Sequence, residues 1–128
     1  MLDSFKTSIV SSAGFLVRVI QLEAIQFDQD NAAPNDAMGT AAWEAGFAAY
    51  SGAATWLDDY SSDIFRTIAI SDTRWSTDFR AWLKAKQKIA VASLTIAHLD
   101  SDPEAIAGTQ AAIGAYAVIL RKLDVLIG

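Results

Sequence analysis

The chain has 128 residues, a formal net charge of −5, one histidine and no cysteine. Hydrophobic residues make up 52% of it and charged residues 20%, so the chain is too apolar for intrinsic disorder. The lack of cysteine excludes a disulfide scaffold, a cysteine-ligated zinc module and an iron–sulfur site. The excess of acids argues against a general affinity for nucleic acid or anionic lipid. The length favours a single domain over residues 1–128.

Alanine, the best helix former, dominates the composition, and the apolar residues recur at helical spacing. The sequence therefore predicts an all-α fold, an up-down bundle of four long helices. We expect these helices over about 4–27, 38–60, 77–99 and 103–127, with a short extra helix near 63–70. Residues 71–73 (Ser-Asp-Thr) are interpreted as a turn before the third long helix.

The second and fourth predicted helices have distinct apolar patterns. In the second, a core seam with alternating spacings of four and three residues is expected at Trp43, Phe47, Tyr50, Ala54 and Leu57. The fourth should begin at Asp102 as N-cap, with Pro103 and Glu104 in its first turn. Its buried stripe is expected at Ile106, Gln110, Ile113, Ala117, Leu120, Leu123 and Ile127.

The sequence contains few groups suited to catalysis. The single histidine, His98, lies near Asp100 and Asp102, but there is no second histidine and no EF-hand spacing, so we interpret it as a capping or surface residue. A Gly-x-Ser-x-Gly motif and a glycine-rich phosphate loop are both missing. We therefore expect no catalytic residue, no metal, no cofactor and no enzymatic activity. A small metal-dependent helical enzyme around His98 stays open as a less favoured alternative.

A basic ridge lies on the third predicted helix, where Arg80, Lys84 and Lys88 are spaced four residues apart. The flanking Trp75 and Trp82 make nucleic-acid binding conceivable, because aromatic side chains can stack on bases. Such a ridge is more often a solvated face or the partner of an acidic protein surface. We therefore keep these cations as candidates for binding phosphate or a protein partner.

The apolar content exceeds what one stripe on each helix requires, so some apolar side chains are expected to meet another chain. Tryptophan is also enriched at the energetic centres of interfaces. The candidate interface residues are Trp56, Trp75, Trp82, Phe65, Val118 and Val125.

No segment satisfies the length of a membrane span, since the longest uncharged stretch, residues 105–120, has 16 residues. We expect no membrane partner and no secretion.

The last part of the sequence carries a family resemblance. The features are Asp100, the Asp102-Pro103-Glu104 helix start, Gln110 and Tyr116, and then Leu120 and Leu123. Residues 99–124 with these features resemble a helical hairpin end in small proteins encoded by tailed bacteriophages. The resemblance implies a role in the virion or in its assembly, a location in the virion or in the bacterial cytoplasm, and no catalytic residues.

The functional hypothesis is a non-enzymatic structural or interaction protein, acting as a homo-oligomer or as a small subunit of a larger assembly such as a phage particle. The main alternative is a helical nucleic-acid-binding protein that uses the basic ridge at residues 74–88.

Overall fold

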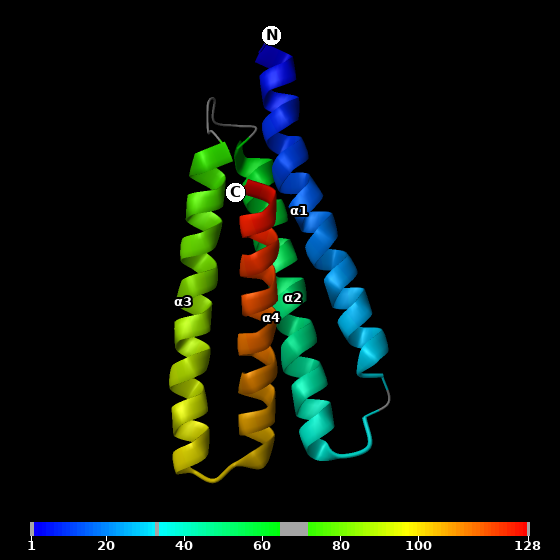
Figure 1. Cartoon of the computed structure of the whole chain (residues 1–128), viewed down its shortest axis with the longest axis vertical. Coiled ribbons are helices and arrows are strands. Elements are labelled where there is room, and N and C mark those ends of the chain that lie inside the picture. The colour runs from blue at the N-terminus through cyan, green and yellow to red at the C-terminus, as the bar shows by residue number, and fades with distance from the viewer. Residues whose placement is uncertain (1, 33, 65–71, 128) are drawn as a thin grey trace.

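The computed structural model of the chain describes residues 2–32, 34–64 and 72–127, with side chains for 12–32, 34–61 and 74–127. These residues form an all-α structure of long helices that alternate in direction (Figure 1). The helices are α1 (Leu2–Asp30), α2 (Ala37–Ile64), α3 (Asp72–Leu99) and α4 (Pro103–Ile127). The predicted all-α bundle is confirmed.

Two predicted boundaries between α2 and α3 differ from the structure. The turn predicted at 71–73 is wrong for Asp72 and Thr73, which already belong to α3. An acidic residue is favourable at a helix start because the unpaired amides there carry partial positive charge, so this polar stretch begins a helix. Of the short helix expected near 63–70, Asp63 and Ile64 extend α2, and the rest lies outside the described residues.

Aspartate caps fix the starts of α2 and α4. The Asp36 carboxylate accepts a hydrogen bond of 2.7 Å from the backbone amide of Gly39. Asp102 accepts one of 3.1 Å from the amide of Ala105, with Pro103 as the first helical residue. Each cap satisfies an amide that has no partner inside its helix. The predicted start at Asp102 is confirmed.

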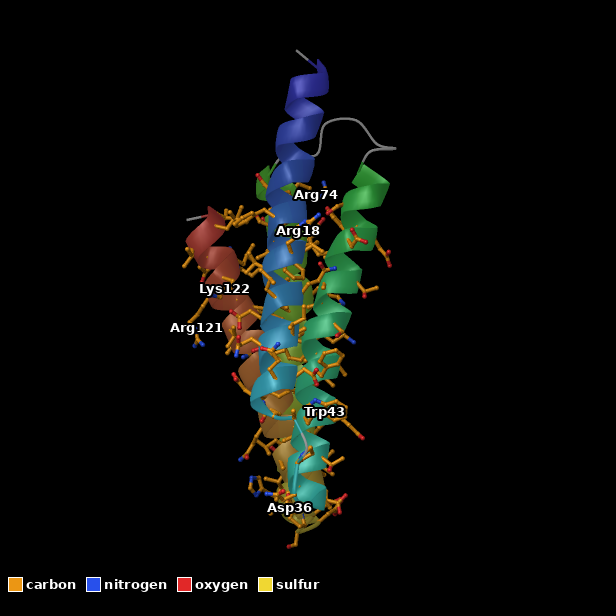
Figure 2. All side chains as sticks on the ribbon, turned by 90° about the vertical axis from the view of Figure 1, so that its right-hand side faces the viewer. Arg18, Asp36, Trp43, Arg74, Arg121 and Lys122 are labelled. Atoms are coloured by element: carbon orange, nitrogen blue, oxygen red, sulfur yellow. The ribbon has the colours of Figure 1, made fainter. Side chains whose placement is uncertain are left out.

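The helices pack in the order α1, α2, α4, α3 rather than as a closed ring. The parallel helices α2 and α4 form the central and most extensive contact, α1 packs mainly on α2, and α3 packs mainly on α4 (Figure 1). Helices α1 and α3 touch each other over few residues. An ion pair between Lys122 of α4 and Glu23 of α1, 3.4 Å apart, adds a link on one side (Figure 2).

The large buried side chains gather at one end of the bundle, the end that holds the C-terminus (Figure 1). All four helices contribute fully buried side chains there, including Leu16 and Ile20 of α1, Leu57 of α2, Trp75, Phe79 and Leu83 of α3, and Ile119 and Leu123 of α4. This end is a complete four-helix core.

The opposite end of the bundle is held together by small residues. Among the described residues, the buried positions at that end are Gly46, Ala90, Ala97 and Gly108. A Cβ atom built on Gly108 would lie 3.4 Å from the Ala41 carbonyl oxygen, so the backbones of α4 and α2 approach closely. This close approach leaves little room for large side chains between α2 and α4. At this end of the bundle, Ile89, Ile96 and Leu99 of α3 are exposed to solvent.

This arrangement changes two predicted core stripes. On α4 the buried residues are Gly108, Ala115, Ile119 and Leu123, while Gln110, predicted in the stripe, is exposed. The stripe is rotated because α4 lies between α2 and α3 and turns its small residues toward α2. In the α2 seam, Tyr50, Ala54 and Leu57 are buried as predicted, but Phe47 is 37% exposed at the edge of α1.

Candidate interaction surfaces

A cluster of aromatic rings joins three helices at the edge of the core. The Trp56 ring of α2 stacks on Phe79 and Trp82 of α3, with centroids 5.6 and 5.3 Å away. Trp82 also meets Tyr116 of α4 edge-on at 6.4 Å. Offset and edge-to-face pairs of this kind stabilise beyond the area they bury. Trp56 and Trp82, both predicted interface residues, are partly buried. Much of the surface of each ring is covered by other residues of the same chain.

The other predicted interface residues lie in different environments. Trp75 is fully buried in the core, so the expectation that it meets another chain is wrong; it is the fourth residue of α3, and its side chain packs into the bundle interior. Val118 is half-buried against the core, and Phe65 lies outside the described residues. Val125 is 85% exposed near the end of α4 and is free to meet a partner.

One of the three cations of the basic ridge, Arg80, takes part in an ion pair within the chain. Arg80 pairs with Asp124 of α4, so its charge is partly neutralised within the chain. Lys84 and Lys88 are exposed. The tryptophans expected beside the ridge do not form a platform for bases, since Trp75 is buried and Trp82 is packed against Trp56. This geometry weakens the nucleic-acid alternative.

A polar network closes the outer side of the aromatic cluster. The Tyr60 hydroxyl donates to Asp78 Oδ2, and Arg74 Nε lies 3.2 Å from the same oxygen. Burial and the Asp78 carboxylate raise the pKa of Tyr60 to about 12. The hydrogen bond from Tyr60, followed by Arg74, lowers the pKa of Asp78. Because Tyr60 stays protonated as a donor, the network links α2 to α3 through Asp78.

No metal centre is found in the part of the chain that the structure describes: no three histidine or acidic side chains come together there. His98, the residue on which the metal-dependent alternative depends, is exposed in the last turn of α3.

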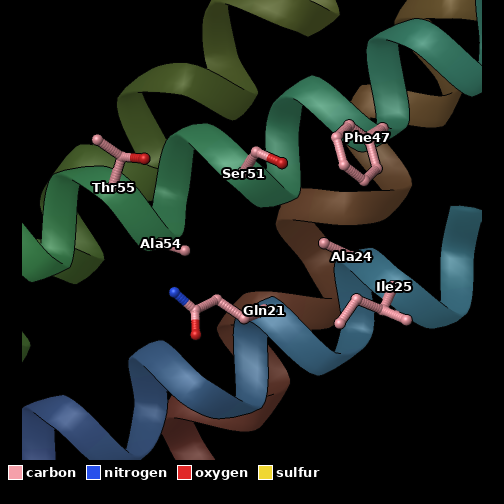
Figure 3. A pocket seen from close by; sticks show the side chains of 7 residues that line it. All are labelled: Gln21, Ala24, Ile25, Phe47, Ser51, Ala54 and Thr55. Carbon is pink, nitrogen blue, oxygen red and sulfur yellow. The ribbon is translucent and has the colours of Figure 1, made fainter.

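A shallow groove of about 380 Å³ runs between α1 and α2 (Figure 3). Phe47 and Ser51 line its α2 side, and Gln21 and Ile25 line its α1 side. It is mostly apolar, and no titratable group lines it. The groove suits an apolar side chain of a partner better than a charged substrate.

The outer face of α1 carries apolar residues that the sequence analysis did not identify. Phe15, Leu22 and Ile25 are all more than half exposed. The inner face of the same helix buries Ala13, Leu16, Ile20 and Ala24 in the core. The seven-residue spacing from Phe15 to Leu22 was the signal for this second apolar face.

The fold defines this protein as an all-α helical bundle with an open arrangement of its outer helices. Comparisons of the chain with protein-family models, with curated proteins and with solved structures found no match. None of the helices, as far as they are described, has a stretch long and apolar enough to cross a membrane.

Proposed function

We propose that this protein is a non-enzymatic structural or interaction protein that works by self-association of its helices, alone or as a small subunit of a larger assembly. The observation that carries this proposal is the exposure of large apolar side chains in ordered stripes on two helices. These residues are Phe15, Leu22 and Ile25 on α1, and Ile89, Ile96 and Leu99 on α3.

Exposed apolar residues that are scattered singly are normal and need no explanation. The α1 residues are not scattered, because spacings of seven and three residues place them on one side of the helix, opposite its buried side. A helix that is apolar on two opposite faces is stabilised when both faces are covered. The core covers one face of α1, and we assign the other to a neighbouring chain.

We propose a phage particle as the larger assembly. This part of the proposal is supported by the resemblance of residues 99–124 to small proteins of tailed bacteriophages. It makes a separate prediction about the genome: genes for a terminase, a portal or a capsid protein should lie beside the gene for this chain. A neighbourhood of metabolic genes would contradict the virion assignment and leave self-association to be tested on the protein itself.

The experiment for self-association is sedimentation velocity at concentrations from low micromolar upward. We expect species larger than the 13.7 kDa monomer, increasing with concentration. Leu22→Gln should weaken association, because it removes an exposed apolar side chain without disturbing the core. Asp59→Asn, at an exposed residue of α2 and so outside the outer face of α1, is the control. A protein that stays monomeric throughout and binds no apolar dye would overturn the proposal.

A further inference from the structure

An apolar stripe on α3 runs out of the aromatic cluster into solvent. Trp82, Ile89 and Ile96 are spaced seven residues apart and therefore lie on one side of the helix. At Trp82 this side packs on Trp56 and Tyr116. One and two heptads further on, Ile89 is 62% exposed and Ile96 is 59% exposed, and Leu99 next to them is 79% exposed.

The chain's own helices leave this part of α3 uncovered. Helix α3 packs mainly on α4, and it touches α1 and α2 over few residues. In its second half the buried residues are Ala90 and Ala97, which lie about 100° around the helix from Ile89 and Ile96, on the flank that meets α4. The stripe is thus a continuous surface that begins in the core and has no covering helix at its far end.

The charges beside the stripe are separated by sign along the helix. Lys84, Lys86 and Lys88 are exposed just before its solvent-facing part, which begins at Ile89. Asp100, Asp102 and Glu104 are exposed after it, in the turn to α4 and the first turn of α4. Within the described residues, none of these six side chains has an ion-pair partner closer than 4 Å. Lys86 lies over the Trp82 ring, 5.5 Å from its centroid. Lys84 and Lys88 repel each other at i, i+4.

We propose that a second copy of this chain covers the stripe, with the two α3 helices antiparallel about a two-fold axis near Ala92. The proposal rests on the self-association proposed above and adds a second interface, on α3, to the one assigned to the outer face of α1. A two-fold axis between positions 92 and 93 places Ile89 at the level of Ile96 of the second copy. It also places Lys84 at the level of position 101, between Asp100 and Asp102 of the second copy.

The pattern is self-complementary, which is what a two-fold interface requires. One lysine-rich end and one acidic end, separated by an apolar stripe, attract a reversed copy of the same helix at both ends. A parallel copy would set lysines against lysines and acids against acids, so the charges select the antiparallel orientation. Few large side chains take part, so we expect a dissociation constant on the order of micromolar and weaker association at high salt.

Cysteine cross-linking tests the orientation directly, because the chain has no cysteine of its own. Ala92 and Ala85 are exposed and lie on the same side of α3, one heptad apart. In the antiparallel dimer two Ala92→Cys residues meet near the axis and should form a disulfide under mild oxidation. Two Ala85→Cys residues would be roughly 20 Å apart, well beyond the ~7 Å limit between α-carbons of a disulfide, and should not. Efficient cross-linking of Ala85→Cys, or none of Ala92→Cys, would overturn the proposal.

Charge exchange tests the pairing. We expect the double variant Lys84→Glu, Lys88→Glu to raise the dissociation constant about tenfold or more, and Asp100→Lys, Glu104→Lys to do the same. Asp102 is left in place because it caps α4. Mixing the two double variants should restore dimers, since each then supplies the charge that the other lacks. Circular dichroism of each variant checks that it folds.

The outcomes separate this inference from the proposed function. If the unaltered protein is monomeric at all concentrations, both are wrong. If it associates, but the charge variants do so unchanged and Leu22→Gln abolishes association, then self-association stands and the α3 interface is wrong.

Discussion

The hydroxyl of Tyr60 donates a hydrogen bond of 2.5 Å to Oδ2 of Asp78, linking α2 to α3 beside the stacked rings of Trp56 and Phe79. The bond holds the phenol in its protonated form. Tyr60 therefore has a pKa of about 12 instead of 10.0, through burial first and the Asp78 carboxylate second.

Alkaline pH should weaken the fold through this tyrosine. Its pKa is raised in the folded state, so its contribution to stability is complete below pH 10.0 and is lost as the pH rises through about 12. Titration of tyrosinate absorbance should show Tyr60 ionising late, and Asp78→Asn should move its midpoint down toward 10.0. Tyr60→Phe identifies its component of the titration. An unchanged late component in Asp78→Asn would contradict the role of the carboxylate.

Two glycines of α2 should respond in opposite directions to alanine. A Cβ atom on Gly46 would lie 2.3 Å from Cζ of Phe27, whereas one on Gly52 would meet nothing within 4 Å. Gly46→Ala should lower the free energy of unfolding by about 1–3 kcal/mol through overpacking. Gly52→Ala should raise it by about 0.5–1 kcal/mol, because alanine is the better helix former. Urea denaturation at one protein concentration measures both.

The clash at Gly46 can be assigned to its partner by a double variant. Phe27→Leu removes the ring atoms nearest the new methyl group, so Gly46→Ala should cost less in that background than alone. Equal costs in the two backgrounds would place the strain elsewhere.

Two isoleucines distinguish folding from association. Ile119 is fully buried in the core and Ile96 is mostly exposed on α3. Ile119→Ala should lower the free energy of unfolding by about 2–5 kcal/mol. Ile96→Ala should change it by about 0.5 kcal/mol or less in the monomer, and should instead weaken self-association. A strongly destabilised Ile96→Ala monomer would show that the stripe is covered within the chain.

The turn between α3 and α4 contains a strained residue. Ser101 has a φ of 51°, and its amide and that of Asp102 donate to the carbonyls of His98 and Ala97 at 3.1 and 3.0 Å. This paired pattern ends helices with a left-handed residue, which is usually glycine. Ser101→Gly should therefore raise the free energy of unfolding by about 0.5–1 kcal/mol. Asp100→Gly, which has no such strain to relieve, should not stabilise the protein.

The local features of the fold could be predicted well. Asp102 followed by Pro103 marked the start of α4. The start predicted near 38 for the second helix lies one residue from Ala37, where α2 begins after its cap at Asp36. Caps of this kind depend on residues three positions apart, so the sequence contains the whole interaction. The start of α3 was missed because Ser71, Asp72 and Thr73 suit a turn and a helix start equally well.

The candidate surfaces were harder to predict because exposure depends on distant residues. Trp75 and Ile96 both lie on α3 and are both large and apolar, yet the first is fully buried and the second is mostly exposed. The difference comes from their neighbours. Trp75 lies in the core to which all four helices contribute, whereas small residues bring α2 and α4 together at the other end and leave α3 at the side.

The composition and the spacing of residues by themselves determined that this chain forms an all-α bundle of long helices, the last of them capped by Asp102, because these properties arise within a few turns of each helix. Only the tertiary structure decided which apolar face of each helix is buried. Helices α1 and α3 are each apolar beyond one face, and the packing order α1, α2, α4, α3 covers just part of that surface. The structure shows where the apolar residues that exceed the needs of the core lie: on the outer face of α1 and along the second half of α3.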